Sequence, residues 1–298
     1  MSKKASELKN YGMSVKNKLL NISRVSGRDY NLVVTRYLQE RLLYRLSISR
    51  YNDRFYLKGG ALLYAYDKLS ARPTMDIDFL GKNISGETNN IARIFAEICA
   101  IDYQEDGVVF DPETITATDI MTGKHYDGVN VSVTAHIDTI TQNVSMDIGF
   151  GDIIIPQSVN LDYPLFLEGM PAIRINAYSK ETTIAEKFQT MIEKSVVNSR
   201  MKDFYDVYSI LMEDRLDRDV LKEAIISVFK NRQTAYVEGH PLFTEEFAND
   251  ALRVRQWETF LKRIKFNDTL AFTEVMTTIK DELMPIWQSL KQFEIDLQ

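Results

Sequence analysis

The stretch Lys58–Gly81, KGGALLYAYDKLSARPTMDIDFLG, decides the fold and holds most of the predicted site. It runs from the end of a short apolar strand through a glycine pair into a helix, and then into a second strand. In that strand Asp76 and Asp78 share one face, because side chains two residues apart in a strand point the same way. Adjacent carboxylates repel each other unless a cation lies between them, so the spacing predicts a divalent-metal site.

The glycine pair, Gly59 and Gly60, lies between the first strand and the helix. Free backbone N–H groups at a helix start attract anions, and the missing Cβ atoms let a phosphate come close. A tight turn that needs unusual dihedral angles is the alternative for the glycines. A solvent-facing strand edge is the alternative for the aspartates. Because Mg²⁺ binds carboxylates together with phosphate oxygens, the combination favours a metal–nucleotide site.

A third carboxylate is expected on another strand. In VSMDIGFGD, Asp147 alternates with Met146 and Ile148, which point to the opposite face. Paired beside the first strand, Asp147 would complete a triad with the two aspartates of the DxD. Asp138 and Asp152 are alternatives that the sequence leaves open.

Composition indicates an ordinary globular protein. The chain has 298 residues, a net charge of −6 and 45% hydrophobic residues, enough for one large domain or two moderate ones. One cysteine and three histidines exclude a disulfide framework and a zinc site, so Cys99, His125, His136 and His240 are expected to be structural. No apolar run reaches membrane length, which predicts a cytoplasmic protein without a membrane segment.

The periodicity predicts a mixed α/β half, residues 1–175, followed by a helical half, residues 176–298. An amphipathic helix is expected over 30–49, a second over 60–69 and a third over 89–100, with β alternation over 107–120, 128–138 and 142–155. The apolar positions expected to be buried in the first two helices are Val33, Tyr37, Leu38, Leu42, Leu46, Leu62, Leu63, Tyr66 and Leu69.

Two helix starts in the second half carry charged residues. In SKETTIAEKFQTMI, Ser179 is placed to cap a helix in which Lys187 borders the apolar stripe, where a lysine either snorkels or reaches a phosphate. In RMKDFYDVYSIL, Asp203 and Asp206 lie near a helix start, where acids also serve as ordinary partners of the helix dipole. Arg200 and Lys202 add positive charge there.

A basic run follows in RVRQWETFLKRIKF, with Arg253, Arg255, Lys262, Arg263 and Lys265 against Glu258 alone. Such a run is typical of a solvated helix face. Beside a catalytic cleft it would instead suit the docking of RNA.

Five ordered motifs, LKGGALL, RPTMDIDFLG, MDIGFGD, AEK and RMKDFYDVYSI, resemble the AbiEii family of nucleotidyltransferase toxins, which includes the MenT-like toxins. The family lies in the polymerase-β-like nucleotidyltransferase superfamily, and the chain has Gly-Gly where that superfamily more often has Gly-Ser. The resemblance implies an α+β fold: a nucleotidyltransferase domain with a short mixed sheet, followed by an α-helical C-terminal domain.

The resemblance also implies a function. This is the Mg²⁺-dependent transfer of a nucleotide from an NTP, GTP or CTP, to an RNA acceptor such as the 3′ end of tRNA. The biological role implied is that of the toxin of a type IV toxin–antitoxin system giving abortive infection against phage. A cognate antitoxin would be encoded alongside, with or without direct contact, and the toxin would be a monomer. A transferase acting on protein and a GTP-binding regulatory module are the alternatives.

The site residues implied by the resemblance fall into three groups. The catalytic residues are Asp76, Asp78, Lys187 and Asp203. The nucleotide-binding residues are Lys58, Gly59, Gly60, Thr74 and Lys187. The metal ligands are Asp76, Asp78 and Asp147.

Overall fold

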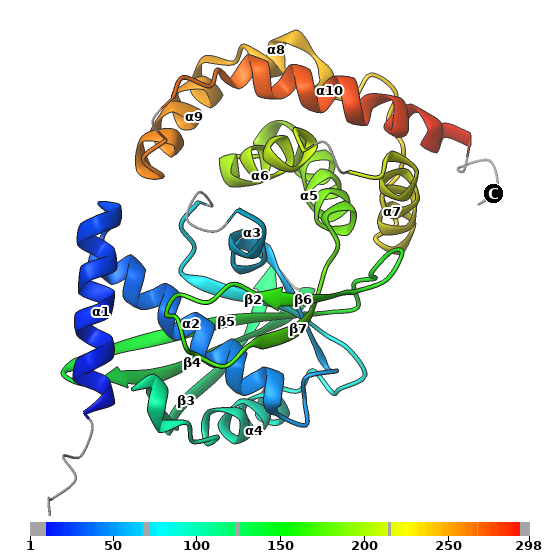
Figure 1. Cartoon of the computed structure of the whole chain (residues 1–298). Helices are drawn as coiled ribbons and strands as arrows, with labels where there is room; N and C mark the ends of the chain where they lie inside the picture. The colour runs from blue at the N-terminus through cyan, green and yellow to red at the C-terminus, as the bar shows by residue number, and fades with distance from the viewer. Residues whose placement is uncertain (1–9, 68–71, 123–124, 214–215, 267, 293–298) are drawn as a thin grey trace, which may run out of the picture. The chain divides into compact units, whose positions relative to one another are not determined.

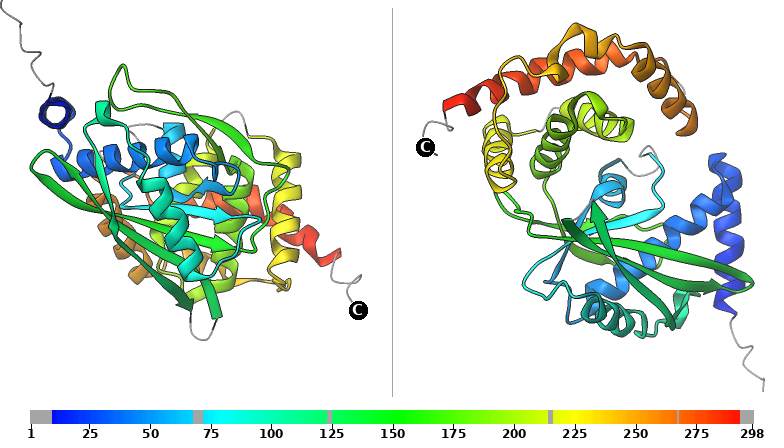
Figure 2. Two further views of the ribbon diagram at one scale, coloured as in Figure 1. Left: turned by 90° about the horizontal axis from the view of Figure 1, so that it is seen from below. Right: turned by 180° about the vertical axis from the view of Figure 1, so that it is seen from behind.

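The computed structural model describes residues 10–67, 72–122, 125–213, 216–266 and 268–292 (Figures 1 and 2). The chain divides into two compact units. The first comprises Met1–Gly151 and Asn160–Ala177, and the second comprises Asp152–Val159 and Tyr178–Gln298.

The first unit is built on a seven-stranded mixed sheet of order β3-β4-β5-β2-β1-β7-β6. Its strands are β1 (Phe55–Lys58), β2 (Asp76–Gly81), β3 (Val109–Thr122), β4 (His125–Ile137), β5 (Ile140–Phe150), β6 (Val159–Tyr163) and β7 (Ile173–Ala177). Its helices are α1 (Tyr11–Ser26), α2 (Tyr30–Ile48), α3 (Gly59–Asp67) and α4 (Thr88–Cys99). The predicted mixed α/β class is confirmed, although the sequence analysis did not identify β6 and β7.

Strand β2 lies in the middle of the sheet. It pairs antiparallel with β1 and parallel with β5, while β3, β4 and β5 form an antiparallel meander. Alternate residues of β4 and β5 are buried, among them Val131, Val133 and Met146. These apolar side chains face α2 and α4, which lie on the same side of the sheet (Figure 2, left). The other face of the central strands carries polar side chains.

An aromatic cluster joins the sheet to α4. The ring centroids of Phe55 on β1 and Phe95 on α4 lie 5.1 Å apart, and Phe79 on β2 packs against both rings. This cluster packs β1 and β2 against α4. The polar face of β2 is therefore presented by a strand whose other side chains are immobilised by packing.

Helix α2 corrects one expectation. The predicted apolar positions are buried, but the polar side chains from Arg36 to Arg45 are buried as well, so the helix is not amphipathic in its setting. Two of these charges have partners within the unit: Arg45 donates to Asp106 at 2.7 Å, and Glu40 accepts from the Phe166 N–H. Burial raises the pKa of Glu40 to about 7, although the adjacent Arg41 opposes the shift.

The helix predicted over 60–69 is observed as α3, which begins at Gly59 and buries Leu62 and Leu63. Leu69 lies outside the described residues, as does the side chain of His125. Cys99 is buried, which raises the pKa of its thiol to about 12, so it is chemically quiet as expected.

The second unit is helical. It contains α5 (Lys180–Lys194), α6 (Met201–Leu211), α7 (Arg218–Asn231), α8 (Glu245–Ala248), α9 (Ala251–Arg263) and α10 (Phe272–Ser289). Ser179 caps α5 as predicted, because its Oγ accepts from the Thr182 N–H at 3.1 Å. Within the described parts of the chain, no helix combines the length and the apolar character needed to cross a membrane.

We predict that Asp106→Ala lowers the free energy of unfolding by about 3–5 kcal/mol, because it leaves the buried Arg45 guanidinium without its counter-charge. Both side chains are almost fully buried. Urea denaturation followed by circular dichroism measures the change. The matched control is Asp102→Ala at an exposed position four residues earlier, where a change within about 0.5 kcal/mol is expected. Equal effects of the two variants would contradict the structural role of the Arg45–Asp106 pair.

Candidate functional site

Four polar residues form one row across the sheet. Lys58 on β1 is paired with Asp78 on β2, Asp78 with Asp147 on β5, and Asp147 with Asn130 on β4. Cross-strand partners point to the same face, and neighbouring strands lie about 4.8 Å apart. The two carboxylates therefore stand side by side, with a lysine at one end of the row and an amide at the other.

The second aspartate of the DxD strand extends this site. Asp76 is paired with Ser145. These two residues come two positions before Asp78 and Asp147 on their strands and therefore lie on the same face. Asp76 is exposed, whereas Asp78 and Asp147 are half-buried. The structure thus brings Asp76, Asp78 and Asp147 to one face, as the alternation of the sequence predicted.

Asn130 was missed by the sequence analysis. Its Nδ2 donates to Asp147 Oδ1 at 2.7 Å and to Ser145 Oγ at 3.0 Å, so it fixes the orientation of the Asp147 carboxylate. The alternation Val129-Asn130-Val131 already indicated that this amide faces away from the core. The register that places it opposite Asp147 depends on the β4–β5 pairing, which the sequence does not state.

Gly59 lies against the Asp78 side chain in a left-handed backbone conformation. Its φ is +66°, which side-chain-bearing residues rarely adopt, and an added Cβ would lie 2.5 Å from Asp78 Cγ and closer still to Oδ2. Gly60 is similarly enclosed, because its Cβ would lie 2.7 Å from Thr74 Cβ and Oγ1. The absence of a Cβ atom at Gly59 and Gly60 therefore leaves room for the side chains of Asp78 and Thr74 at the start of α3.

The rival carboxylates lie in other surroundings. Asp138 is in the β4–β5 turn, at the opposite end of β5 from Asp147, and its Oδ2 accepts from Lys16 Nζ at 2.9 Å. Asp152 belongs to the second unit, where Arg232 donates to it at 2.8 Å. In the first unit Asp147, and not Asp138, is the carboxylate next to Asp78.

The chemistry of the donor set suits a hard cation. Asp76, Asp78 and Asp147 offer only carboxylate oxygens, which are the ligands that Mg²⁺ prefers. In the described residues, no group of three or more His, Cys, Asp or Glu is already gathered closely enough to hold a metal ion. The three carboxylates share one face of the sheet, with Asp78 and Asp147 as neighbours in the row and Asp76 two residues before Asp78 on the same strand.

Lys187, Asp203, Asp206 and Arg200 form a cluster in the second unit. Lys187 Nζ donates to Asp203 at 2.6 Å and lies 2.9 Å from Asp206, while Arg200 Nε donates to the other Asp203 oxygen at 2.5 Å. Burial alone would raise the pKa of Asp203, but the charges and hydrogen bonds of Lys187 and Arg200 outweigh it and hold the pKa well below its usual range. The catalytic roles predicted for Lys187 and Asp203 stay predictions.

Comparison of folds identifies the class. The structure is similar to MenT4, a nucleotidyltransferase toxin from Mycobacterium tuberculosis H37Rv, with a TM-score of 0.54 and 14% identity over 94% of this chain and 98% of that one. JHP933 from Helicobacter pylori gives a TM-score of 0.48 and 13% identity over 90% of this chain and 97% of that one. The first similarity establishes the predicted nucleotidyltransferase fold. No curated protein sequence matches the chain.

The family follows from the sequence. Residues 41–278 match the family described as "Nucleotidyl transferase AbiEii toxin, Type IV TA system". The chain therefore belongs to this family of nucleotidyltransferase toxins, as the five motifs predicted, and it is a nucleotidyltransferase enzyme.

We predict that Gly59→Ala lowers nucleotidyl transfer at least about tenfold, because the new Cβ must push the Asp78 carboxylate out of the row. Gly27→Ala is the matched control: Gly27 has φ +67° with nothing within 4 Å of an added Cβ. Both variants should lose about 1–2 kcal/mol from the left-handed backbone alone. Rates and urea midpoints of the two variants are compared. A Gly59→Ala enzyme with wild-type rates would refute the role assigned to this contact.

A second prediction concerns pH. The folded-state pKa of Asp203 lies below the value near 3.9 of an unfolded aspartate, so its stabilising contribution is present above about pH 4 and is lost as the pH falls further. Asp203→Asn should cost about 3–5 kcal/mol near pH 6, with the deficit narrowing below pH 4. Denaturant unfolding between pH 3 and pH 7 measures the gap. The exposed Asp219→Asn serves as the control, and a gap for Asp203→Asn that stays constant with pH would contradict the ion-pair cluster.

Proposed function

We propose that this toxin transfers a nucleoside monophosphate from GTP or CTP to the 3′ end of an RNA, with tRNA as the acceptor, in a Mg²⁺-dependent reaction. One observation carries the proposal: Asp78 and Asp147 are cross-strand partners on the face that also carries Asp76, beside the glycines that begin α3. Enzymes that transfer phosphoryl and nucleotidyl groups depend mainly on positioning and on charge stabilisation.

The residues that would hold Mg²⁺ are Asp76, Asp78 and Asp147. When bound, the ion offsets the negative charge of the triphosphate and lowers the pKa of the attacking hydroxyl. Asn130 keeps Asp147 turned toward the row, since its amide occupies one oxygen and leaves the other for a ligand. Gly59 lets Asp78 approach the start of α3 without a clash.

The remaining residues of the first unit would receive the nucleotide. The first N–H groups of α3 would donate to phosphate oxygens, and Lys58 at the end of the row would supply a positive charge for the triphosphate. Thr74, against Gly60, adds a hydroxyl at the same helix start. In the reaction, the 3′ hydroxyl loses its proton to solvent, the O3′–Pα bond forms, the bond from Pα to the bridging oxygen breaks, and pyrophosphate leaves.

The biological setting follows from the family. A type IV toxin–antitoxin system pairs the toxin with a cognate antitoxin, and transfer to tRNA 3′ ends would block aminoacylation and so arrest growth. We propose that the toxin acts as a monomer, since the carboxylate row is supplied by a single chain.

The decisive experiment incubates the protein with Mg²⁺, total RNA and each of the four NTPs labelled at the α-phosphate, followed by electrophoresis and RNase treatment. We expect label from GTP or CTP in RNA of tRNA size. Label that enters protein, or that comes from a γ-labelled NTP, would replace the proposal with protein modification or phosphoryl transfer. Absence of any transfer with all four nucleotides would overturn it.

The row is tested within the same assay. Asp78→Asn and Asp147→Asn keep the shape of the side chain but remove its charge, so each should lower transfer at least about 100-fold, while the fold is retained. Asp138→Asn is the matched control, because Asp138 is an aspartate of the same β4–β5 hairpin that lies away from the row. If Asp138→Asn were as damaging as Asp147→Asn, the assignment of the third carboxylate would be wrong.

A further inference from the structure

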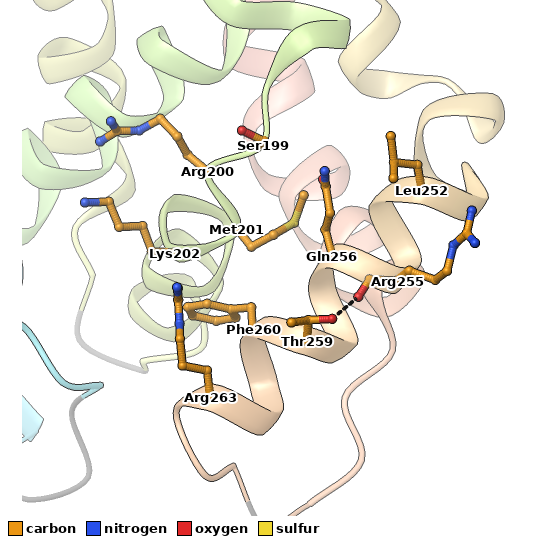
Figure 3. A pocket seen from close by; sticks show the side chains of 10 residues that line it. All are labelled: Ser199, Arg200, Met201, Lys202, Leu252, Arg255, Gln256, Thr259, Phe260 and Arg263. Carbon is orange, nitrogen blue, oxygen red and sulfur yellow. Dashed lines mark hydrogen bonds between the residues drawn. The ribbon is translucent and has the colours of Figure 1, made fainter.

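The second unit contains a groove between the start of α6 and one face of α9 (Figure 3). Its volume is about 770 Å³, which is within the range of ligand-binding clefts. Met201 and Phe260, both almost fully buried, form an apolar floor. The full lining is Ser199, Arg200, Met201, Lys202, Leu252, Arg255, Gln256, Thr259, Phe260 and Arg263.

The lining is strongly basic although the protein is acidic. Four of the ten lining residues are cations: Arg200, Lys202, Arg255 and Arg263. None of the ten is an aspartate or a glutamate. The chain as a whole has a net charge of −6. Arg200 is paired with Asp203, which leaves a local excess of three positive charges in an acidic protein, and such an excess suits a polyanion.

The α9 side of the groove is a single helix face. The lining positions 252, 255, 256, 259, 260 and 263 recur at intervals of three and four residues, as one face of a helix does. Arg255 and Arg263 are eight positions apart, a rise of about 12 Å, which suits two different phosphates of a strand better than a single phosphate group. Among the residues that the structure describes, neither arginine makes an ion pair with a carboxylate.

The arginines of the basic run lie in two different surroundings. Arg255 and Arg263 line the groove, and both are exposed. Arg253 does not, because it pairs with Asp250, donates to the Val196 carbonyl oxygen and stacks 4.1 Å from the centre of the Phe247 ring. The expectation of a solvated helix face is therefore wrong at Arg253, whose side chain packs against its own unit.

The α6 side supplies the other two cations. Arg200 precedes the helix and is held by Asp203 through its Nε, so the salt bridge fixes the arginine at the mouth of the groove. Figure 3 shows the Arg200 and Lys202 side chains on the α6 side and Arg263 on the α9 side. Ser199, Gln256 and Thr259 add uncharged hydrogen-bonding groups between them.

We propose that this groove binds the sugar–phosphate backbone of a single RNA strand, and so holds the acceptor of the transfer reaction. The inference rests on the proposed function for the identity of the polyanion as an RNA acceptor. Cations on both walls contact phosphates, and the polar side chains contact ribose hydroxyls. An RNA strand is favoured over an acidic protein because the lining combines cations with the uncharged hydrogen-bonding groups of Ser199, Gln256 and Thr259, which suit ribose hydroxyls.

The test measures RNA binding directly, without NTP, by fluorescence anisotropy of a labelled single-stranded oligoribonucleotide. The variant Lys202→Gln/Arg255→Gln/Arg263→Gln changes three exposed groove residues. We expect a Kd at least tenfold higher at 0.1 M salt. The slope of log Kd against log salt should fall by about 2, since each phosphate contact contributes about 0.7 for a single strand.

The matched control is Lys222→Gln/Lys280→Gln/Lys291→Gln, which removes the same charge from helices α7 and α10 and the segment after α10, and is expected to bind RNA like the wild type. Circular dichroism checks that both triple variants are folded. An equal loss of RNA affinity in the groove variant and the control variant would mean a non-specific charge effect and would overturn the proposed RNA-binding site. So would unchanged binding by the groove variant.

Two further outcomes separate this inference from the proposed function. If the protein transfers no nucleotide but binds RNA through the groove, the proposed RNA-binding site is supported and the proposed transfer reaction is contradicted. If a groove variant transfers nucleotide and has the wild-type Kd and salt slope, the transfer reaction is supported and the RNA-binding site is contradicted.

Groove-dependent binding of poly-glutamate in preference to RNA would assign the surface to an acidic protein and overturn the inference.

Discussion

Strand β2 is hydrogen-bonded to β1 on one side and to β5 on the other, and the register of those two ladders determines which side chains stand beside Asp78. A slip of one residue in either ladder would turn Asp147 or Lys58 into the apolar face. The buried partners Ile77, Phe79 and Met146 prevent that slip, because each would have to leave the core. The polar row is thus maintained by the packing on the opposite face of the same strands.

A second constraint acts at the junction of β1 and α3. The chain must turn from strand to helix within reach of the Asp78 carboxylate, and only a residue without a Cβ, in a left-handed conformation, leaves room for it. The same glycine that permits this approach also begins α3, and the free N–H groups of a helix start suit an anion. Gly59 therefore sets both the position of the Asp78 carboxylate and the start of α3. This explains why the glycines and the DxD strand occur together in the sequence.

Period and alternation were sufficient to predict the mixed fold, the helix over 30–49 and the shared face of Asp76 and Asp78, since each depends on local geometry. They could not predict partners distant in the chain. The Asn130–Asp147 hydrogen bond, the contact of Asp78 with Gly59 and the ion pairs of Lys187 all join separate elements. The burial of the charged side of α2 was also missed, because the compensating Asp106 lies 61 positions after Arg45. Likewise, the inward turn of Arg253 depends on Phe247 and Val196 and not on the basic run itself.

The most direct measurement of the central claim is a crystal structure with Mn²⁺ and a non-hydrolysable triphosphate, in which anomalous scattering locates the metal. We predict a metal peak bound by Asp78 together with Asp76 or Asp147, with phosphate oxygens at the start of α3. A metal–triphosphate complex bound elsewhere on the protein, with the row of Lys58, Asp78, Asp147 and Asn130 unchanged and unliganded, would contradict it.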